Sequence, residues 1–285
     1  MLIFILSLPR RIDGIRTSAS PCEIISGNQS IGAVTNPSGS IGSYFDGYID
    51  QLVFVFNKSK SRDQILDDAT LVVHYSMDCL SYSSLDSGPN QIDGTAIGLN
   101  SDGGRVGQSY LFNSTTSYFQ VEGLILLGQT YRSFSFALWL RPIISVTNGG
   151  TILHTSQTTN GLGWCYQYLG LSSTGEIIVY IPGAEGAVQL TGPVLIVDEW
   201  VHIAVTHSRQ NGLCLYINGL LYNQSDPFIY QPNGQPMIVT LGQSLSGSSC
   251  SRGSIQSGYY RGQIDEFYIY SRELSKKDVM MLVNQ

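Results

Sequence analysis

Residues 259–271 of this chain read Tyr-Tyr-Arg-Gly-Gln-Ile-Asp-Glu-Phe-Tyr-Ile-Tyr-Ser, and residues 44–56 read Tyr-Phe-Asp-Gly-Tyr-Ile-Asp-Gln-Leu-Val-Phe-Val-Phe. The two stretches are offset by 215 residues. Two shorter blocks match in the same order: 23–31 with 237–245, and 12–15 with 217–220. Three blocks in one order predict an internal repeat. We therefore interpret residues 1–66 as the truncated C-terminal part of an upstream copy and residues 71–285 as one complete module.

The complete module is dominated by strand signals. Residues 133–140 alternate with period two, so that Phe134, Phe136, Leu138 and Leu140 share one face. Further strands are predicted at residues 176–181, 200–206, 213–217, 220–222 and 264–270. Asn-Gly at 218–219 favours a hairpin turn, because both residues tolerate positive φ. The predicted fold is an all-β, two-sheet antiparallel sandwich.

A single stretch near the C-terminus is typical of a helix. Ser-Lys-Lys-Asp at 275–278 has the form of a capping box, and it precedes the apolar run at 279–283. The sandwich should therefore end in a short C-terminal helix.

Composition limits the class of protein. Of the 285 residues, 13% are charged, about half the usual share of about 25%. The net charge of −6 argues against a nucleic-acid partner held by phosphate neutralisation. No apolar run approaches the ~20 residues of a membrane helix. The apolar run at residues 2–6 fits a strand of the truncated copy. A signal-peptide core is the alternative, but no basic segment precedes the run and Arg10 and Arg11 follow it.

Several features favour an extracellular location, either secreted or in the ectodomain of a larger protein. Asn-x-Ser/Thr sequons begin at Asn28, Asn57, Asn113 and Asn223, which are the candidate glycosylation sites. None of the five cysteines forms a Cys-x-x-Cys pair, so a zinc or thioredoxin-type site has no support. Cys214 lies within a predicted strand, so we interpret it as a buried thiol. Cys22 and Cys79 have no obvious partner.

A family resemblance rests on the order of several blocks. They are residues 71–78, 86–94, 134–141, 200–206, 215–219 and, most specifically, 260–275. Together they resemble the laminin-G-like and pentraxin-like branch of the concanavalin A-like lectin/glucanase superfamily. The resemblance implies a jelly roll. It also implies a disulfide between Cys165 and Cys250, because similar proteins carry cysteines at both places.

Calcium is the cofactor that the resemblance suggests. Tight Gly-rich turns with Asp and Asn oxygens suit a hard cation, and residues 86–94 form such a turn. We expect a structural calcium near Asp86, Asn90 and Asp265. The alternative is that Asp86 and Asn90 close an Asx-type turn and Asp265 hydrogen-bonds at the sheet end. The acidic cluster of a pentraxin-type double-calcium site is not visible.

Catalysis finds little support in the sequence. Glycoside hydrolysis needs two carboxylates facing each other, but Asp198-Glu199 and Asp265-Glu266 are neighbours that would point to opposite faces of a strand. The four histidines, His74, His154, His202 and His207, are interpreted as structural residues. We therefore expect no enzyme activity.

Aromatic side chains are the candidate ligand-binding residues. Trp164 alternates with Tyr166 and Tyr168, so in a strand the three would share one face, and Tyr259 and Tyr260 lie in a Ser/Gly-rich loop. Aromatic rings stack on sugars, although they also fill cores. The expected function is an extracellular, non-catalytic binding or adhesion module from a tandem array, with a glycan or an extracellular protein as partner. The alternatives are a spacer without its own ligand and a domain associated with glycoside hydrolysis.

Overall fold

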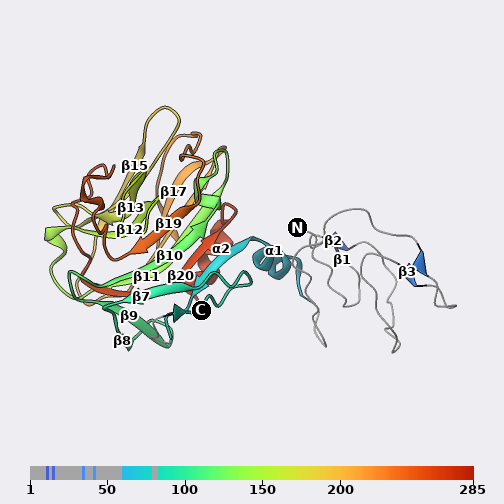
Figure 1. Cartoon of the computed structure of the whole chain (residues 1–285), viewed down its shortest axis with the longest axis horizontal. Helices are drawn as coiled ribbons and strands as arrows, with labels where there is room; N and C mark the ends of the chain where they lie inside the picture. The colour runs from blue at the N-terminus through green and yellow to red at the C-terminus, as the bar shows by residue number, and fades with distance from the viewer. Residues whose placement is uncertain (1–10, 13–14, 17–33, 36–40, 43–59, 79–82) are drawn as a thin grey trace. The chain divides into compact units, whose positions relative to one another are not determined.

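The computed structural model describes residues 11–12, 15–16, 34–35, 41–42, 60–78 and 83–285, and the chain splits into two compact units, Met1–Thr70 and Leu71–Gln285 (Figure 1). Within the described part of the chain, no helix is long and apolar enough to cross a membrane. Five predicted features lie outside the described residues: the strand at 2–6, Cys22, Asn28, Asn57 and Cys79.

The described residues of the first unit form two short antiparallel pairs and one helix. β1 (Arg11–Ile12) pairs with β2 (Ile15–Arg16), and β3 (Val34–Thr35) pairs with β4 (Ile41–Gly42). The helix is α1 (Arg62–Thr70).

The start of α1 resembles the start of the C-terminal helix α2 (Lys276–Val283). Ser61 Oγ accepts from the Gln64 N–H at 3.2 Å, and Gln64 Oε1 accepts from the Ser61 N–H at 2.9 Å. Ser275 and Asp278 form the same reciprocal capping box in α2, as the sequence predicted. The two helices therefore correspond at an offset of 214, one residue less than the strands before them. That residues 1–66 are an incomplete copy stays a prediction.

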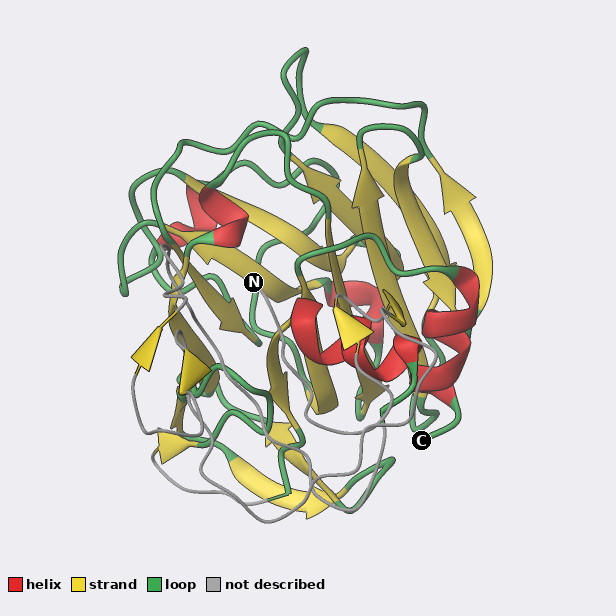
Figure 2. Cartoon of the chain, turned by 90° about the vertical axis from the view of Figure 1, so that its right-hand side faces the viewer, coloured by secondary structure: helices red, strands yellow, loops and turns green. Residues whose placement is uncertain are grey.

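The second unit, Leu71–Gln285, is a sandwich of two antiparallel sheets (Figures 1 and 2). Sheet 1 has the strand order β15 (Val188–Val194), β14 (Glu176–Ile181), β13 (Cys165–Leu171), β12 (Gly150–Ser156), β19 (Met237–Leu241), β10 (Tyr118–Leu124), β7 (Gly94–Ile97) and β6 (Ser83–Ser84). Sheet 2 has the strand order β18 (Leu220–Gln224), β17 (Gly212–Ile217), β16 (Val201–Ser208), β11 (Phe134–Pro142), β20 (Gly262–Tyr270), β9 (Gln108–Phe112) and β8 (Asn100–Gly103), with β5 (Leu71–Tyr75) also paired to β20.

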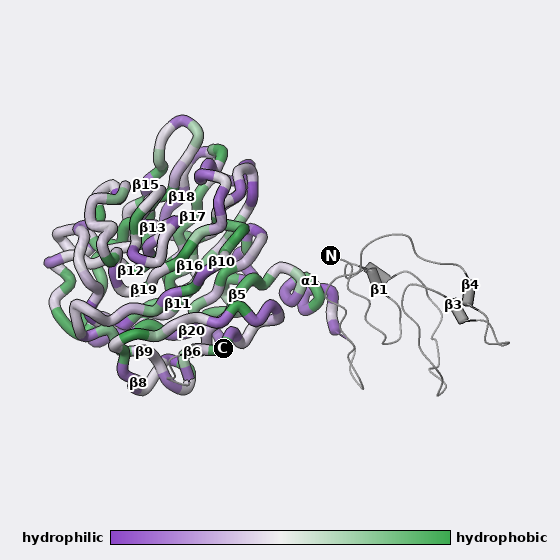
Figure 3. The backbone as a smooth tube through the Cα atoms, in the orientation of Figure 1, coloured by the Kyte–Doolittle hydropathy of each residue, from purple (hydrophilic) through white to green (hydrophobic). Residues whose placement is uncertain are grey.

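The core lies between the two sheets, and the alternation in β11 sets which side chains enter it. Phe134, Phe136, Leu138 and Leu140 are all buried there, as predicted. Hydrophobic segments follow strands such as β10 and β16 in Figure 3. Buried tyrosines satisfy their hydroxyls inside the core, as in the 2.7 Å hydrogen bond between Tyr168 and Tyr230.

The opposite face of sheet 2 packs against α2. Val279 and Leu282 of the helix are buried with Ala137, Ala204 and Tyr268, all of which point away from the main core. Small alanines let the helix approach the sheet closely. The predicted turn before β18 also forms, with φ of 49° at Asn218 and 81° at Gly219.

The outer face of sheet 1 is crossed by residues 250–258. Ile255 of this segment is buried, and a Cβ at Gly170 would lie 2.5 Å from the Ile255 side chain. Gln167 N–H donates to Ser251 O, and Gln256 N–H donates to Leu171 O, both at 2.9 Å. The Ser/Gly-rich loop is therefore an ordered cover on the sheet.

Candidate functional site

A solvent-open cavity of about 130 Å³ lies at the end of β13 where this covering segment leaves sheet 1. One wall is the loop that carries the 3-10 helix η2 (Val146–Asn148), and the other wall is residues 258–261. The described residues that line the cavity are Ile144, Ser145, Val146, Asn148, Gly149, Leu171, Gly258, Tyr259, Tyr260 and Arg261.

Gly149 and Gly150 allow the backbones of the two cavity walls to approach each other closely. Gly149 has φ of 75°, and a Cβ there would lie 2.3 Å from Cβ of Gln256. The Gly150 N–H donates to Gln256 O at 3.0 Å, and the Thr151 N–H donates to Gly258 O at 2.9 Å. Because bulkier residues would separate the two backbones, these contacts fix the position of the cavity.

Polar and aromatic groups stand at the mouth over an apolar floor. The Arg261 guanidinium lies over the Tyr259 ring, 5.8 Å from its centroid. Arg261 and Asn148 are exposed, and Tyr259 is half-buried. Val146 and Leu171 are buried beneath them. This combination can place an aromatic face, hydrogen-bond donors and one positive charge against a small ligand.

The aromatic candidates separate into different environments. Tyr259 lines the cavity, but Tyr260 is 1% exposed, and desolvation raises the pKa of its hydroxyl. Tyr260 packs on Phe112 in the core and also lines the cavity, and its role in ligand binding stays a prediction. The sequence hid this burial because a Ser/Gly-rich context resembles an exposed loop.

Trp164 belongs to another surface. It is half-buried and packs at a tilt against Tyr166, with ring centroids 4.6 Å apart, while Tyr166 stacks on Tyr180 at 5.9 Å. Trp164 precedes β13, whereas Leu171 at its far end lines the cavity. A strand of 7 residues spans about 20 Å. The structure therefore does not bring Trp164 and Tyr259 together.

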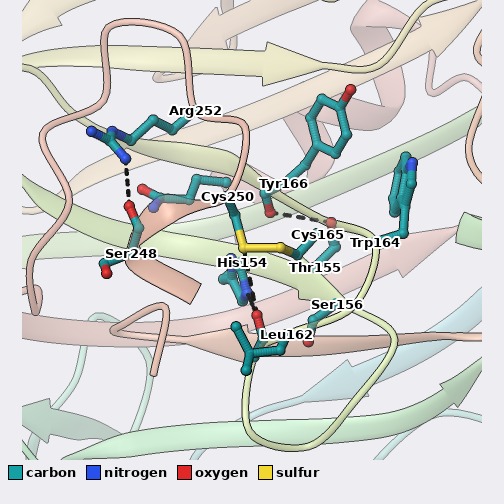
Figure 4. Close-up of a disulfide and its surroundings, with 12 residues drawn as sticks. His154, Thr155, Ser156, Leu162, Trp164, Cys165, Tyr166, Ser248, Cys250 and Arg252 are labelled. Atoms are coloured by element: carbon teal, nitrogen blue, oxygen red, sulfur yellow. Dashed lines mark hydrogen bonds between the residues drawn. A yellow bond between two sulfur atoms is a disulfide. The ribbon is translucent and has the colours of Figure 1, made fainter. Parts of the chain in front are cut away.

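The disulfide implied by the resemblance is present between Cys165 and Cys250. Figure 4 shows the Trp164 and Tyr166 rings beside it. The bond attaches the start of the covering segment to the start of β13, at the end of that strand away from the cavity. Cys214 is a buried free thiol, and desolvation raises its pKa.

The three residues expected around calcium make separate hydrogen-bond networks. The Asp86 carboxylate accepts from the backbone N–H groups of His74, Gly88 and Ile92 at 2.8–3.1 Å. The Asn90 amide donates to Leu71 O and Val72 O. The hydrogen bond from Gly88 N–H to Asp86 has the form of an Asx turn, whereas Asn90 donates to β5 and not within its own turn.

Asp265 is fully buried in β20, and its carboxylate accepts from the N–H groups of Arg105, Val106 and Glu266 at 2.7–3.0 Å. Desolvation nevertheless raises the pKa of Asp265 to about 7, against the opposing effect of those N–H donors. Glu266 has φ of 50° at a shift in strand register. Its Oε2 atom accepts a hydrogen bond from the Tyr268 hydroxyl and lies 2.8 Å from His74 Nε2. Within the described ranges, no group of three or more His, Cys, Asp or Glu side chains is arranged to hold a metal ion. Calcium binding stays a prediction.

Titratable groups are sparse near the cavity. No Asp, Glu, His or Cys is among the described residues that line it. His202 and His207 lie on opposite faces of β16, against Trp139 and against Phe134 respectively, and desolvation lowers the pKa of both.

Sequence reasoning did not single out Arg261, Ser145 or Asn148. Arg261 was visible beside the tyrosines in the repeated block, but nothing in the sequence indicated its distant partners.

Solved structures with a similar fold include binding domains of two toxins. The receptor binding domain of botulinum neurotoxin D aligns with a TM-score of 0.54 and 16% identity, over 76% of this chain and 53% of that chain. The binding domain of Paraclostridial Mosquitocidal Protein 1 aligns with a TM-score of 0.54 and 20% identity, over 76% and 52%. The aligned region is therefore about half of each toxin domain, and these likenesses show the fold alone.

Domain 4 of AbnA, a GH43 extracellular arabinanase from Geobacillus stearothermophilus solved with arabinotriose, aligns with a TM-score of 0.49 and 19% identity, over 75% of this chain and 98% of that chain. No curated protein sequence matches this chain. A laminin G family model, described as the concanavalin A-like lectin/glucanases superfamily, matches residues 113–280, which is more than half of the chain. The chain therefore belongs to the concanavalin A-like lectin/glucanases superfamily.

Proposed function

We propose that residues 71–285 form an extracellular, non-catalytic binding module that holds a glycan in the cavity beside Tyr259. The observation that carries this proposal is the pairing of a half-buried aromatic ring with free polar groups over an apolar floor. Sugars offer both C–H faces and hydroxyls, so a ring and hydrogen-bond donors recognise them together. The described residues of the lining include no pair of carboxylates for glycoside hydrolysis.

The extracellular setting is proposed on chemical grounds. The Cys165–Cys250 disulfide is suited to an oxidising compartment, because cytosolic thiols are kept reduced. Asn113 is an exposed sequon residue that follows β9. A tandem array would place several such modules, and hence several cavities, along one chain.

A glycan array tests this function. The wild-type chain should give saturable signals that Tyr259→Ala removes. Tyr131→Ala is the matched control, because Tyr131 is 66% exposed and does not line the cavity. Glycan signals that survive Tyr259→Ala would place binding elsewhere. No signal on any glycan would favour the spacer alternative.

Two additions to the array test the absence of catalysis and the role of calcium. Incubation with polysaccharides should release no reducing ends, and release would overturn the non-catalytic assignment. Because backbone N–H groups already occupy the carboxylates of Asp86 and Asp265, the alternative without calcium predicts that EDTA leaves the array signals and the melting temperature unchanged. A fall of several degrees would instead support the calcium site.

A further inference from the structure

The cavity carries one positive charge that the protein does not neutralise. Arg141 and Arg272 form ion pairs with Asp198 and Asp278, and Arg105 lies over Trp139. By contrast, the Arg261 guanidinium lies over the Tyr259 ring and forms no ion pair or hydrogen bond with any described residue.

The described residues that line the cavity with Arg261 carry no negative charge. The Asn148 amide and the Ser145 hydroxyl line the same cavity, and Ser145 already contacts Thr147 at 2.9 Å. The Asn148 side chain makes no hydrogen bond to a described residue, and no carboxylate is among the described lining residues. An anionic group entering here meets an unpaired guanidinium and no opposing charge, although the whole chain has a net charge of −6.

We propose that the cavity recognises a sugar unit that bears a carboxylate, with Arg261 as the group that selects the charge. This inference rests on the proposed glycan-binding function. The planar guanidinium fork can donate two parallel hydrogen bonds to a carboxylate. The Tyr259 ring faces the sugar C–H groups, and the Asn148 amide donates to a hydroxyl.

The cavity is open to solvent, so one sugar unit of a glycan can enter it while the rest of the glycan stays outside. The floor of Ile144, Val146 and Leu171 is apolar, so it suits the ring carbons. The carboxylate therefore stays at the mouth with Arg261, where it remains partly hydrated.

The test compares two ligands that differ only at C6: methyl glucuronide and methyl glucoside, titrated calorimetrically into the full chain. We expect the glucuronide to bind about tenfold more tightly, which corresponds to about 1.4 kcal/mol. Arg261→Gln should remove this difference, and Arg261→Lys should keep only part of it because the fork is lost. Arg209→Gln is the matched control, since Arg209 is an exposed arginine in the turn between β16 and β17. Added salt should reduce the preference, because the charges are only partly buried.

The possible results separate this inference from the function on which it rests. Equal binding of both sugars, lost in Tyr259→Ala, would overturn the selection of a carboxylate and leave glycan binding intact. Glucuronide binding that is unchanged in Arg261→Gln would also overturn it. Competition by inorganic phosphate or by N-acetylglutamate as strong as that by glucuronide would show an anion site without sugar recognition. Failure of every saccharide to bind would overturn both proposals.

Discussion

Removing the Cys165–Cys250 disulfide should destabilise the module strongly. The two cysteines are 85 residues apart in sequence, so the bond closes a long loop in the unfolded chain. The chain-entropy relation gives a loss of about 15 cal/mol/K for such a loop, or about 4.6 kcal/mol at 25 °C. Replacing both cysteines by alanine should therefore lower the free energy of unfolding by about 3–5 kcal/mol.

Urea denaturation followed by tryptophan fluorescence measures this loss in the right part of the chain, because Trp139, Trp164 and Trp200 all lie in residues 71–285. With a slope of about 2–3 kcal/mol/M, the midpoint should fall by about 1–2.5 M. Wild-type protein unfolded with a reductant is the control, and it should lose a similar amount if the cross-link itself is responsible. A loss below about 1 kcal/mol would refute this reasoning and would mean that the covering segment is held by its other contacts.

Three further predictions concern the cavity, the histidines and the sequons. Gly149→Ala should weaken glycan binding and lower the free energy of unfolding more than Gly234→Ala. Both glycines have positive φ, but a Cβ at Gly234 meets nothing within 4 Å. Equal losses in urea unfolding would contradict the close approach of the two walls. Desolvation lowers the pKa of His202 to about 4, below the unfolded value of about 6.5, so the folded state binds fewer protons and stability should fall between pH 6.5 and 4 by about 3 kcal/mol. His202→Asn should reduce this fall in stability between pH 6.5 and 4, measured by urea unfolding at each pH. An equal fall in the variant and the wild-type protein would contradict the role of His202. In a secretory expression host, mass spectrometry should find Asn113 glycosylated more fully than Asn223, whose amide donates to Thr191 O at 3.0 Å; equal occupancy would contradict this.

The strands of the module were predictable because their physical cause is local. A period of two in β11 follows directly from one buried face, and the Asn218-Gly219 turn and the Ser275–Asp278 capping box depend on neighbours within a few residues. The repeat likewise needs only a comparison of the chain with itself. Such features can be predicted from one sequence without knowing which strands pair.

The candidate site depends on contacts between distant residues. Asn148 and Arg261 reach one cavity because residues 256–261 pair with the backbone at residues 143–151, more than one hundred positions earlier. Tyr260 is buried by the same pairing, which local composition does not reveal. The positive φ of Glu266 has a similar cause, since a register shift in β20 is set by its partner strand β11.

A crystal structure of the chain with its best glycan from the array tests the central claim most directly. The account predicts a sugar unit in the cavity, with its ring against Tyr259 and a polar substituent at Arg261. A sugar bound instead on the Trp164 and Tyr166 rings, or at any position away from residues 143–149 and 258–261, would contradict it.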